Sequence, residues 1–344
     1  MAQSFISNKE QGFTLIELIV ALALGLILVA AATQLFIGGL LSSRLQKANA
    51  EIQDSGIFGL EYMARDIRLL NYGNVVNPQL TDTTPWGGIV LTGSTATNAN
   101  NINFIPKVDT NTYIPEALLS RGAGDTVSTV NNHWKGLSNI QNSSNAEEQS
   151  DQLTIQFIAP TNMTNCEGVN VLAGDLIVQR YFLRVDNNGS SQQDYALACD
   201  ANTPEVSATA QPDIVNGLGD AGQIILPRID HFHVLLGAKN AAGNFAYYTI
   251  PQYRVAAQAA RDASPAVAAP RILSIQISVL ARSTNNAQNK AIDPNQSFLM
   301  LDQTVHAADN RTRFLRRVYS VTIALRNAMG AVSYTHLTLP TTNL

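Results

Sequence analysis

The chain has 344 residues, a formal net charge of −4 and 14% charged residues, against about 25% in a typical soluble domain. It has no basic excess with which to neutralise phosphates, so direct binding of nucleic acid is not expected. A content of 45% hydrophobic residues supports a buried core and argues against disorder. Two cysteines exclude a disulfide-dense miniature fold and a four-cysteine zinc site. These figures favour a membrane-anchored protein with a sizeable head.

An uncharged apolar segment extends from Leu18 to Leu41 and exceeds the roughly 20 residues that a membrane-spanning helix needs. A cleaved secretory signal would have a shorter apolar core, with a small-residue cleavage site after it. No such site follows here, because Ser42, Ser43 and Arg44 begin a helical continuation. We therefore expect this segment to anchor the chain in a membrane.

One carboxylate, Glu17, lies a single turn inside the apolar region, and the polar residues 1–12 before it end in Gly12. An ionised carboxylate near the bilayer centre costs about 2.5–3.5 kcal/mol, so an anchor with no other role gains nothing from it. If the chain were cut after Gly12, Phe13 would carry a new α-amino group, with which Glu17 of a neighbouring subunit could pair. Such pairs would set the axial register between subunits, and we interpret Glu17 as an assembly residue.

Residues 12–18, Gly-Phe-Thr-Leu-Ile-Glu-Leu, resemble the type III signal of type IV pilins and type II secretion pseudopilins. The resemblance implies that a prepilin peptidase cuts between Gly12 and Phe13 and that the Phe13 amine is methylated. It also implies that Glu17 serves assembly.

The charges around the signal depart from the usual pattern. Leaders of this kind are basic, whereas here Lys9 is balanced by Glu10, and Arg44 and Lys47 follow the apolar segment. The positive-inside count alone would favour a cytoplasmic head. The motif outweighs this count, because only two or three charges are involved, and we expect a periplasmic head.

The helix is expected to continue without a break from Phe13 to about Leu70, since no proline occurs before Pro78. Its second half is amphipathic, with apolar residues mostly at three- and four-residue steps. These residues are Leu45, Ala48, Ile52, Met63, Ile67 and Leu70. We expect this stripe to pack under a globular head, and Gly56 and Gly59 to mark a bend or a place of close packing.

Beyond residue 71 the apolar pattern shifts toward a period of two, which predicts half-buried strands in a mainly antiparallel sheet. The predicted strands are 151–158, 175–183, 229–236, 272–280 and 318–325. Residues 92–103 and 138–150 are interpreted as exposed loops, and 256–269 as a short helix or a loop. The fold class is therefore α+β, with a long N-terminal helix packed on a mainly antiparallel β-sheet head.

Several patches in the head are similar to those of PilW-like minor pilins, and they occur in the same order along the chain. They are residues 64–68 before Tyr72-Gly73, Ser150-Asp151, residues 165–168 (Asn-Cys-Glu-Gly), 197–199 (Leu-Ala-Cys), and 317–319 leading to 325–327. The resemblance covers residues 12 to about 330. It implies partnership with a prepilin peptidase, with other major and minor pilins, and with an inner-membrane assembly platform.

Cys166 and Cys199 are expected to form a disulfide if the head is exported, because the periplasm is oxidising. The alternative is two unrelated buried thiols. In the family a cysteine often follows the tyrosine-glycine at the helix end, but here Asn74 stands nearby. A second bridge is therefore not expected.

No catalytic motif is evident, since the sequence has neither a G-x-S-x-G elbow nor a P-loop, and we expect neither an enzyme nor a cofactor. His231 and His233 would share one face of a strand, but no ligand signature completes a metal site, so a structural or surface pair is favoured. Four aspartates near polar loops lack an EF-hand pattern and are interpreted as solvated turn residues: Asp125, Asp151, Asp186 and Asp194. Five aromatic residues are expected to pack in the core or in loops: Trp86, Trp134, Tyr247, Tyr248 and Tyr253.

The expected organisation is a cleaved leader (1–12), a membrane-spanning half-helix (13–41), an amphipathic half-helix (42–72), a β-rich periplasmic head (73–330) and an uncharged, atypical tail (331–344) that we interpret as an artefact of read-through or sequence assembly. The expected function is that of a minor pilin, first in the inner membrane and then in a pilus fibre at the cell surface. Two alternatives remain open: a tip pseudopilin of a type II secretion system, and a membrane-anchored periplasmic binding module or enzyme.

Overall fold

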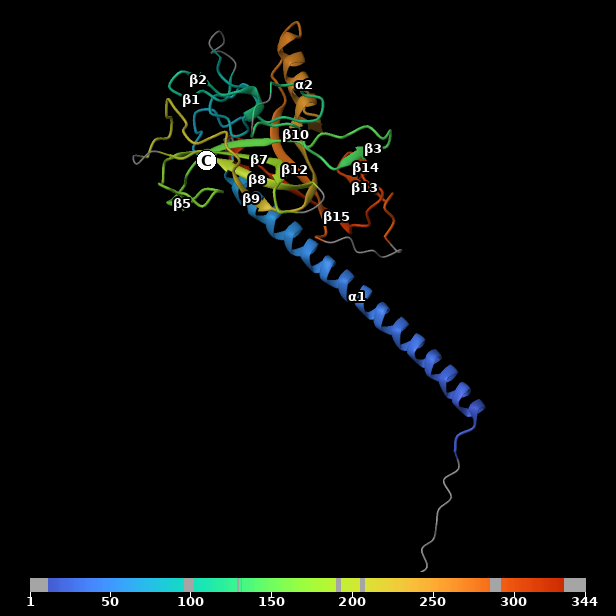
Figure 1. Cartoon of the computed structure of the whole chain (residues 1–344). Coiled ribbons are helices and arrows are strands. Elements are labelled where there is room, and N and C mark those ends of the chain that lie inside the picture. The colour runs from blue at the N-terminus through green and yellow to red at the C-terminus, as the bar shows by residue number, and fades with distance from the viewer. Residues whose placement is uncertain are drawn as a thin grey trace, which may run out of the picture.

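A long helix projects from a β-rich head in the computed structural model (Figure 1). The structure describes residues 12–95, 102–128, 130, 132–189, 193–204, 208–284 and 292–330. The expected leader lies outside these residues except for Gly12, and the atypical tail lies entirely outside them.

The projecting helix is α1, Leu15–Leu69, with 55 residues, which corresponds to a length of about 82 Å at 1.5 Å per residue. Thr14 is its N-cap, and Glu17 completes a capping box in which the two residues satisfy each other's backbone amides. The helix ends at Leu69, and the amide of its C-cap residue, Leu70, donates to the carbonyl of Ile67. The single continuous helix expected over 13–70 is therefore confirmed.

Two four-stranded sheets form the framework of the head, and every pairing between their strands is antiparallel. The first sheet has the order β11-β10-β12-β15. Its strands are β10 (Ile229–Lys239), β11 (Phe245–Thr249), β12 (Arg271–Arg282) and β15 (Arg316–Ala324). The second sheet has the order β4-β7-β8-β9. Its strands are β4 (Leu153–Ile158), β7 (Leu176–Asp186), β8 (Asp194–Ala201) and β9 (Gln223–Leu226).

Smaller elements surround these sheets. Helix α2, Ile250–Asp262, packs against β10 and β11. A three-stranded sheet pairs β3 (Ile140–Asn142), β14 (Gln303–Ala307) and β13 (Ser297–Met300). Short hairpins pair β1 (Lys107–Asp109) with β2 (Thr112–Tyr113) and β5 (Met163–Thr164) with β6 (Asn170–Val171). Two 3-10 turns, η1 (Glu116–Leu118) and η2 (Arg326–Ala328), complete the described elements.

The second half of α1 docks against β15, β12 and β9, and so contacts both large sheets. Its apolar stripe is buried in the main core, with Met63 and Ile67 fully inaccessible. A Cβ at Gly56 would lie 2.2 Å from the Tyr319 ring, and one at Gly59 would lie 2.1 Å from Leu226. The two glycines therefore mark close packing between helix and sheet.

The five strands predicted from the sequence are all present, as β4, β7, β10, β12 and β15. Two expectations for the rest of the head were wrong or incomplete. The supposed loop 138–150 contains β3, which pairs with β14. Asn103, at the end of the supposed exposed loop 92–103, is fully buried, and its side chain accepts hydrogen bonds from the amides of Leu91 and Thr92. Residues 96–101 of that loop lie outside the described residues. The segment 256–269, expected to be a short helix or a loop, contains the end of α2 followed by irregular chain.

The aromatic residues divide between the core and the surface. Trp134 is buried and donates from Nε1 to the carbonyl of Ser150 at 2.8 Å. Tyr253 is buried and donates to the carbonyl of Pro270 at 2.7 Å. Tyr247, on β11, is 38% exposed and meets Phe245 edge to face. The packing interpretation is therefore confirmed for Trp134 and Tyr253.

Candidate assembly site

The first half of α1 has no contact with the head and is exposed on all sides (Figure 1). Its large apolar side chains, from Leu15 to Leu40, are each between 44% and 80% exposed. Among the described residues α1 is the one helix that is long and apolar enough to cross a membrane. An apolar surface of this extent is not stable in water, so it needs a bilayer or other apolar helices around it.

Glu17 is held at the start of this exposed half by the N-cap. Its Oε2 accepts hydrogen bonds from the Thr14 amide at 3.0 Å and from the Thr14 hydroxyl at 2.9 Å. The Thr14 hydroxyl oxygen in turn accepts from the Glu17 amide at 3.4 Å. This geometry fixes a carboxylate at the helix N-terminus, where the helix dipole favours negative charge. An amine at the start of an adjacent helix could approach it from the open side.

The two residues before the cap are accessible. Phe13 is 88% exposed, and a Cβ built on Gly12 would meet nothing within 4 Å. No described residue covers the peptide bond between Gly12 and Phe13. The expected cleavage, methylation and assembly residues are thus adjacent in the structure.

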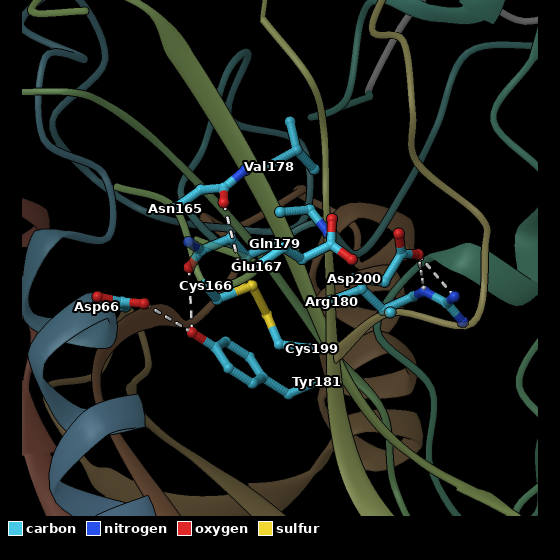
Figure 2. Close-up of a disulfide and its surroundings, with 12 residues drawn as sticks. Asp66, Asn165, Cys166, Glu167, Val178, Gln179, Arg180, Tyr181, Cys199 and Asp200 are labelled. Carbon is cyan, nitrogen blue, oxygen red and sulfur yellow. Dashed lines mark hydrogen bonds and ion pairs between the residues drawn. A yellow bond between two sulfur atoms is a disulfide. The ribbon is translucent and has the colours of Figure 1, made fainter. Parts of the chain in front are cut away.

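A second carboxylate, Asp66, lies in the docked half of α1 and is only 1% exposed. The Tyr181 hydroxyl, from β7, donates to Asp66 Oδ2 at 3.0 Å (Figure 2). Arg65 Nε lies 3.4 Å from Asp66 Oδ1. Burial raises the pKa of Asp66, and the Tyr181 and Arg65 contacts oppose that rise. This hydrogen bond links the helix to the second sheet in the middle of the core.

Cys166 and Cys199 are joined by a disulfide, with their Cα atoms 6.1 Å apart (Figure 2). It ties the turn between β5 and β6 to the centre of β8. Arg180 and Asp200 lie beside it as a fully buried ion pair, with Nη2 2.7 Å and Nε 2.9 Å from Oδ2. The disulfide and the Tyr181–Asp66 bond lie on the face of the second sheet that α1 covers. The ion pair lies on the other face, because successive side chains of a strand point to opposite sides.

The two histidines share one face of β10, with ring centroids 6.1 Å apart. His231 is fully buried, and its ring nitrogens contact Ser150 and Gln303. His233 lies between Asp151, 2.9 Å from Nδ1, and Asp302, 2.8 Å from Nε2. Burial alone would lower the pKa of His233, but the charges and hydrogen bonds of the two aspartates raise it to about 10. A protonated imidazole donates from both nitrogens, so His233 acts as an ion-pair partner rather than as a metal ligand.

The interpretation of two aspartates as solvated turn residues was wrong. Asp151 is 1% exposed, and in addition to its contact with His233 it accepts from the amide of Val234 at 2.7 Å. Asp194 is 5% exposed and forms an ion pair with Arg282. Asp151 lies two residues before β4, and Asp194 is the first residue of β8. Their burial depends on how the strands pair and pack, which the sequence alone does not show.

Sequence reasoning missed the contacts of Asp66 and of the Arg180–Asp200 pair. One signal was available for Asp66, because it stands between Met63 and Ile67 of the buried stripe, as Glu17 stands inside the exposed one. No such signal marks Tyr181, which is 115 residues away from Asp66.

Two family models match the chain. Residues 7–33 match the prokaryotic N-terminal methylation motif, and residues 180–327 match Type IV Pilus-assembly protein W. The first match covers the start of α1, and the second covers the whole first sheet and β8 and β9 of the second sheet. The chain belongs to the type IV pilin superfamily and is a PilW-like minor pilin. The superfamily is a structural, non-enzymatic class, and the methylation motif implies processing by a prepilin peptidase and association with other pilins.

The comparison with solved structures gave a type IV-like pilin from Thermus thermophilus, with 14% identity and a TM-score of 0.34, covering 80% of this chain and 97% of that one. No curated protein matches the chain. The family assignment rests on the two family models, and the fold class on the helix and sheets described above.

Proposed function

We propose that this protein is a low-copy subunit at or near the tip of a type IV pilus, where it helps to initiate assembly. The observation that carries the proposal is the exposed apolar half of α1 with one carboxylate, Glu17, fixed at its start. A surface of this kind suits burial among identical or related helices, and a single charge gives such a bundle its axial register.

The proposed cycle begins in the inner membrane, with the head in the periplasm. A prepilin peptidase cuts after Gly12, and the new Phe13 amine is methylated. Glu17 then pairs with the amine of a neighbouring subunit as the apolar helices bundle. Burial of the apolar surface continues as the subunit leaves the bilayer, so extraction does not expose it to water.

The proposed position at the tip is supported by the size of the head, residues 73–330. A repeating shaft subunit must pack against copies of itself on several sides, and a large, loop-rich head hinders such packing. A subunit at the end of the fibre has no neighbour above it, so its head has no such limit. Immunogold labelling of the head should mark fibre ends, whereas labelling along the whole shaft would contradict the tip position.

The role of Glu17 is tested with two variants in the native host. Glu17→Gln keeps a side-chain oxygen that can accept from the Thr14 amide but removes the charge. Glu17→Ala removes both the oxygen and the charge. Each variant should be inserted and cleaved, yet surface pili should fall to near the level of a gene deletion. The matched control is Glu61→Gln, which removes an exposed carboxylate from the docked half of the same helix, and it should assemble normally. Normal piliation with Glu17→Gln would contradict the charge-pairing role.

Processing is tested separately with Gly12→Ala, which should leave an uncleaved precursor. The mass of the intact chain should then show the leader retained and no added methyl group.

The tip-pseudopilin alternative is tested by a clean deletion, scoring sheared pili and secreted exoproteins side by side. Lost pili with intact secretion would support the pilus, and normal pili with trapped exoproteins would move the protein to a secretion machine. The PilW match over residues 180–327 favours the pilus.

A further inference from the structure

Three carboxylates from separate parts of the head meet beside the disulfide. One oxygen each from Glu167, Asp200 and Asp220 lie within 4.8 Å of one another. Glu167 follows Cys166 and Asp200 follows Cys199, so the disulfide fixes two of the three residues next to each other. Asp220 reaches the cluster from the loop before β9 and is exposed.

The cluster carries excess negative charge. The buried Arg180 neutralises Asp200 through two hydrogen bonds to its Oδ2. Within the described part of the chain, neither Glu167 nor Asp220 has an ion-pair partner of its own, and both side chains are held by backbone amides, those of Ala201 and Gly222. Counting Arg180 as +1 and the three carboxylates as −3 leaves a net charge of −2, which one divalent cation would balance.

A second observation, on Asp200, points to a ligand. Its side chain is fully buried, and Oδ2 accepts all of its hydrogen bonds, from Arg180 and from the amide of Gly219 at 2.9 Å. Asp200 Oδ1 is buried and has no hydrogen-bond partner among the residues that the structure describes. In Figure 2 the oxygen of Asp200 that Arg180 does not contact is turned toward the Glu167 carboxyl group. A buried anionic oxygen without a partner is unfavourable, and a bound cation would satisfy it.

The electrostatics of the cluster agree with this geometry. Burial raises the pKa of Glu167, and the charges of Asp220 and Asp200 raise it further. Burial also raises the pKa of Asp200, although Arg180 opposes that rise.

We propose that Glu167, Asp200 and Asp220 bind one Ca²⁺ ion beside the Cys166–Cys199 disulfide. The ligands are all carboxylate oxygens, which suit a hard cation, and Ca²⁺ accepts irregular geometry and completes its shell with water better than Mg²⁺ does. Asp220 provides the entry from solvent. The ion would tie the β5–β6 turn, β8 and the loop before β9 together, in addition to the disulfide. The site is independent of the assembly role of α1.

The test uses the mature full-length chain in detergent micelles, freed of metal with a chelator and titrated with CaCl2 by calorimetry. With three carboxylate ligands we expect one ion per chain and a dissociation constant of about 0.1–1 mM, in the range of extracellular calcium modules. Glu167→Gln and Asp220→Asn keep an oxygen that can accept from the amides of Ala201 and Gly222 while removing one charge each. Each should weaken binding at least tenfold, and the control Glu147→Gln, an exposed glutamate elsewhere on the head, should bind as the wild type does.

Melting temperatures give an independent readout. In chelator, Glu167→Gln should melt at the wild-type temperature or above it, because the repulsion is relieved. In millimolar CaCl2 the wild type should gain several degrees and Glu167→Gln should gain little. Absence of calcium binding by the wild type, or equal binding by Glu167→Gln and Asp220→Asn, would overturn the site. An equal response to MgCl2 would overturn the assignment to calcium. Asp220 is exposed, so its variant keeps the test valid if Glu167→Gln folds poorly.

Discussion

The two halves of α1 share one uninterrupted backbone but have opposite surroundings. From Leu15 to Leu40 the apolar side chains are exposed on every side, and glycines such as Gly38 have free space around them. From Ile52 to Leu69 one stripe is buried in the head, and Gly56 and Gly59 touch side chains of the sheets. The difference shows that helix formation is common to both halves, whereas the packing partner of each half is set by its pattern of apolar residues.

Each half also carries one carboxylate among apolar residues, and the two are satisfied differently. Glu17 is held by its own N-cap, Thr14, and remains exposed. Asp66 is buried and is held by Tyr181 from the opposite sheet. Glu17 is therefore accessible to another molecule, whereas Asp66 is already hydrogen-bonded within the chain. Position along the helix thus separates an exposed carboxylate from one that is hydrogen-bonded within the head.

Loss of the disulfide is expected to have the largest effect, because it should destabilise the head and the docked half of α1 but not the exposed half. Cys166→Ala/Cys199→Ala should lower the free energy of unfolding of the head by about 3–4 kcal/mol, since the bridge closes a loop of separation 33. We would follow denaturant unfolding of the mature chain in detergent by circular dichroism. The signal of the sheets and of the docked half of α1 should be lost at a lower denaturant concentration than in the wild type, while the helix signal of the exposed half persists. Equal stability of the variant and the wild type would contradict this role.

A smaller effect is expected from Gly59→Ala, because the new Cβ would lie 2.1 Å from Leu226, which is itself buried. Such overpacking costs about 1–3 kcal/mol. The matched control is Gly38→Ala, whose Cβ meets nothing within 4 Å, and it should leave the melting temperature of the head unchanged. If both variants melted as the wild type does, the close packing of the docked half would be wrong.

The smallest effect concerns the pH dependence of the docked half. Because the pKa of Asp66 is raised in the folded protein, the folded state binds more protons than the unfolded state between the ordinary and the raised value. Stability from this group is therefore greatest below the ordinary pKa and falls as the pH rises through that window. Asp66→Asn should flatten this part of the stability profile, measured by urea unfolding at several acidic and neutral pH values. Glu61→Gln, on the exposed face, is the control, and a profile for Asp66→Asn as steep as that of the wild type would contradict the prediction.

The sequence predicted those parts of the fold in which apolar residues repeat or alternate along the chain. The helix and the strands β4, β7, β10, β12 and β15 have such sequence patterns, although burial in β4, β7 and β10 is nearly continuous. Strand β8 was not predicted, since residues 195–199 are apolar without alternation. The short strand β3 was not predicted, because its partner β14 lies more than 160 residues further along the chain.

The candidate site was predictable only where it is local. Residues 12–18 hold the proposed cleavage, methylation and assembly positions in one continuous segment, and a motif indicates them directly. Asp66 meets Tyr181 only because the helix packs on the second sheet. Glu167, Asp200 and Asp220 are brought together by the disulfide and by the loop before β9. No spacing in the sequence marks such clusters, because the distances that matter are across the fold.

The unbroken helix has a mechanical consequence. The last turns of α1 lie inside the head, and its first turns lie where a bundle would hold them, with no flexible linker between the two. Tension applied to the head would therefore pass along a hydrogen-bonded rod directly to the bundle. The orientation of the head relative to the first half of α1 is therefore fixed by the same buried contacts that hold the fold together.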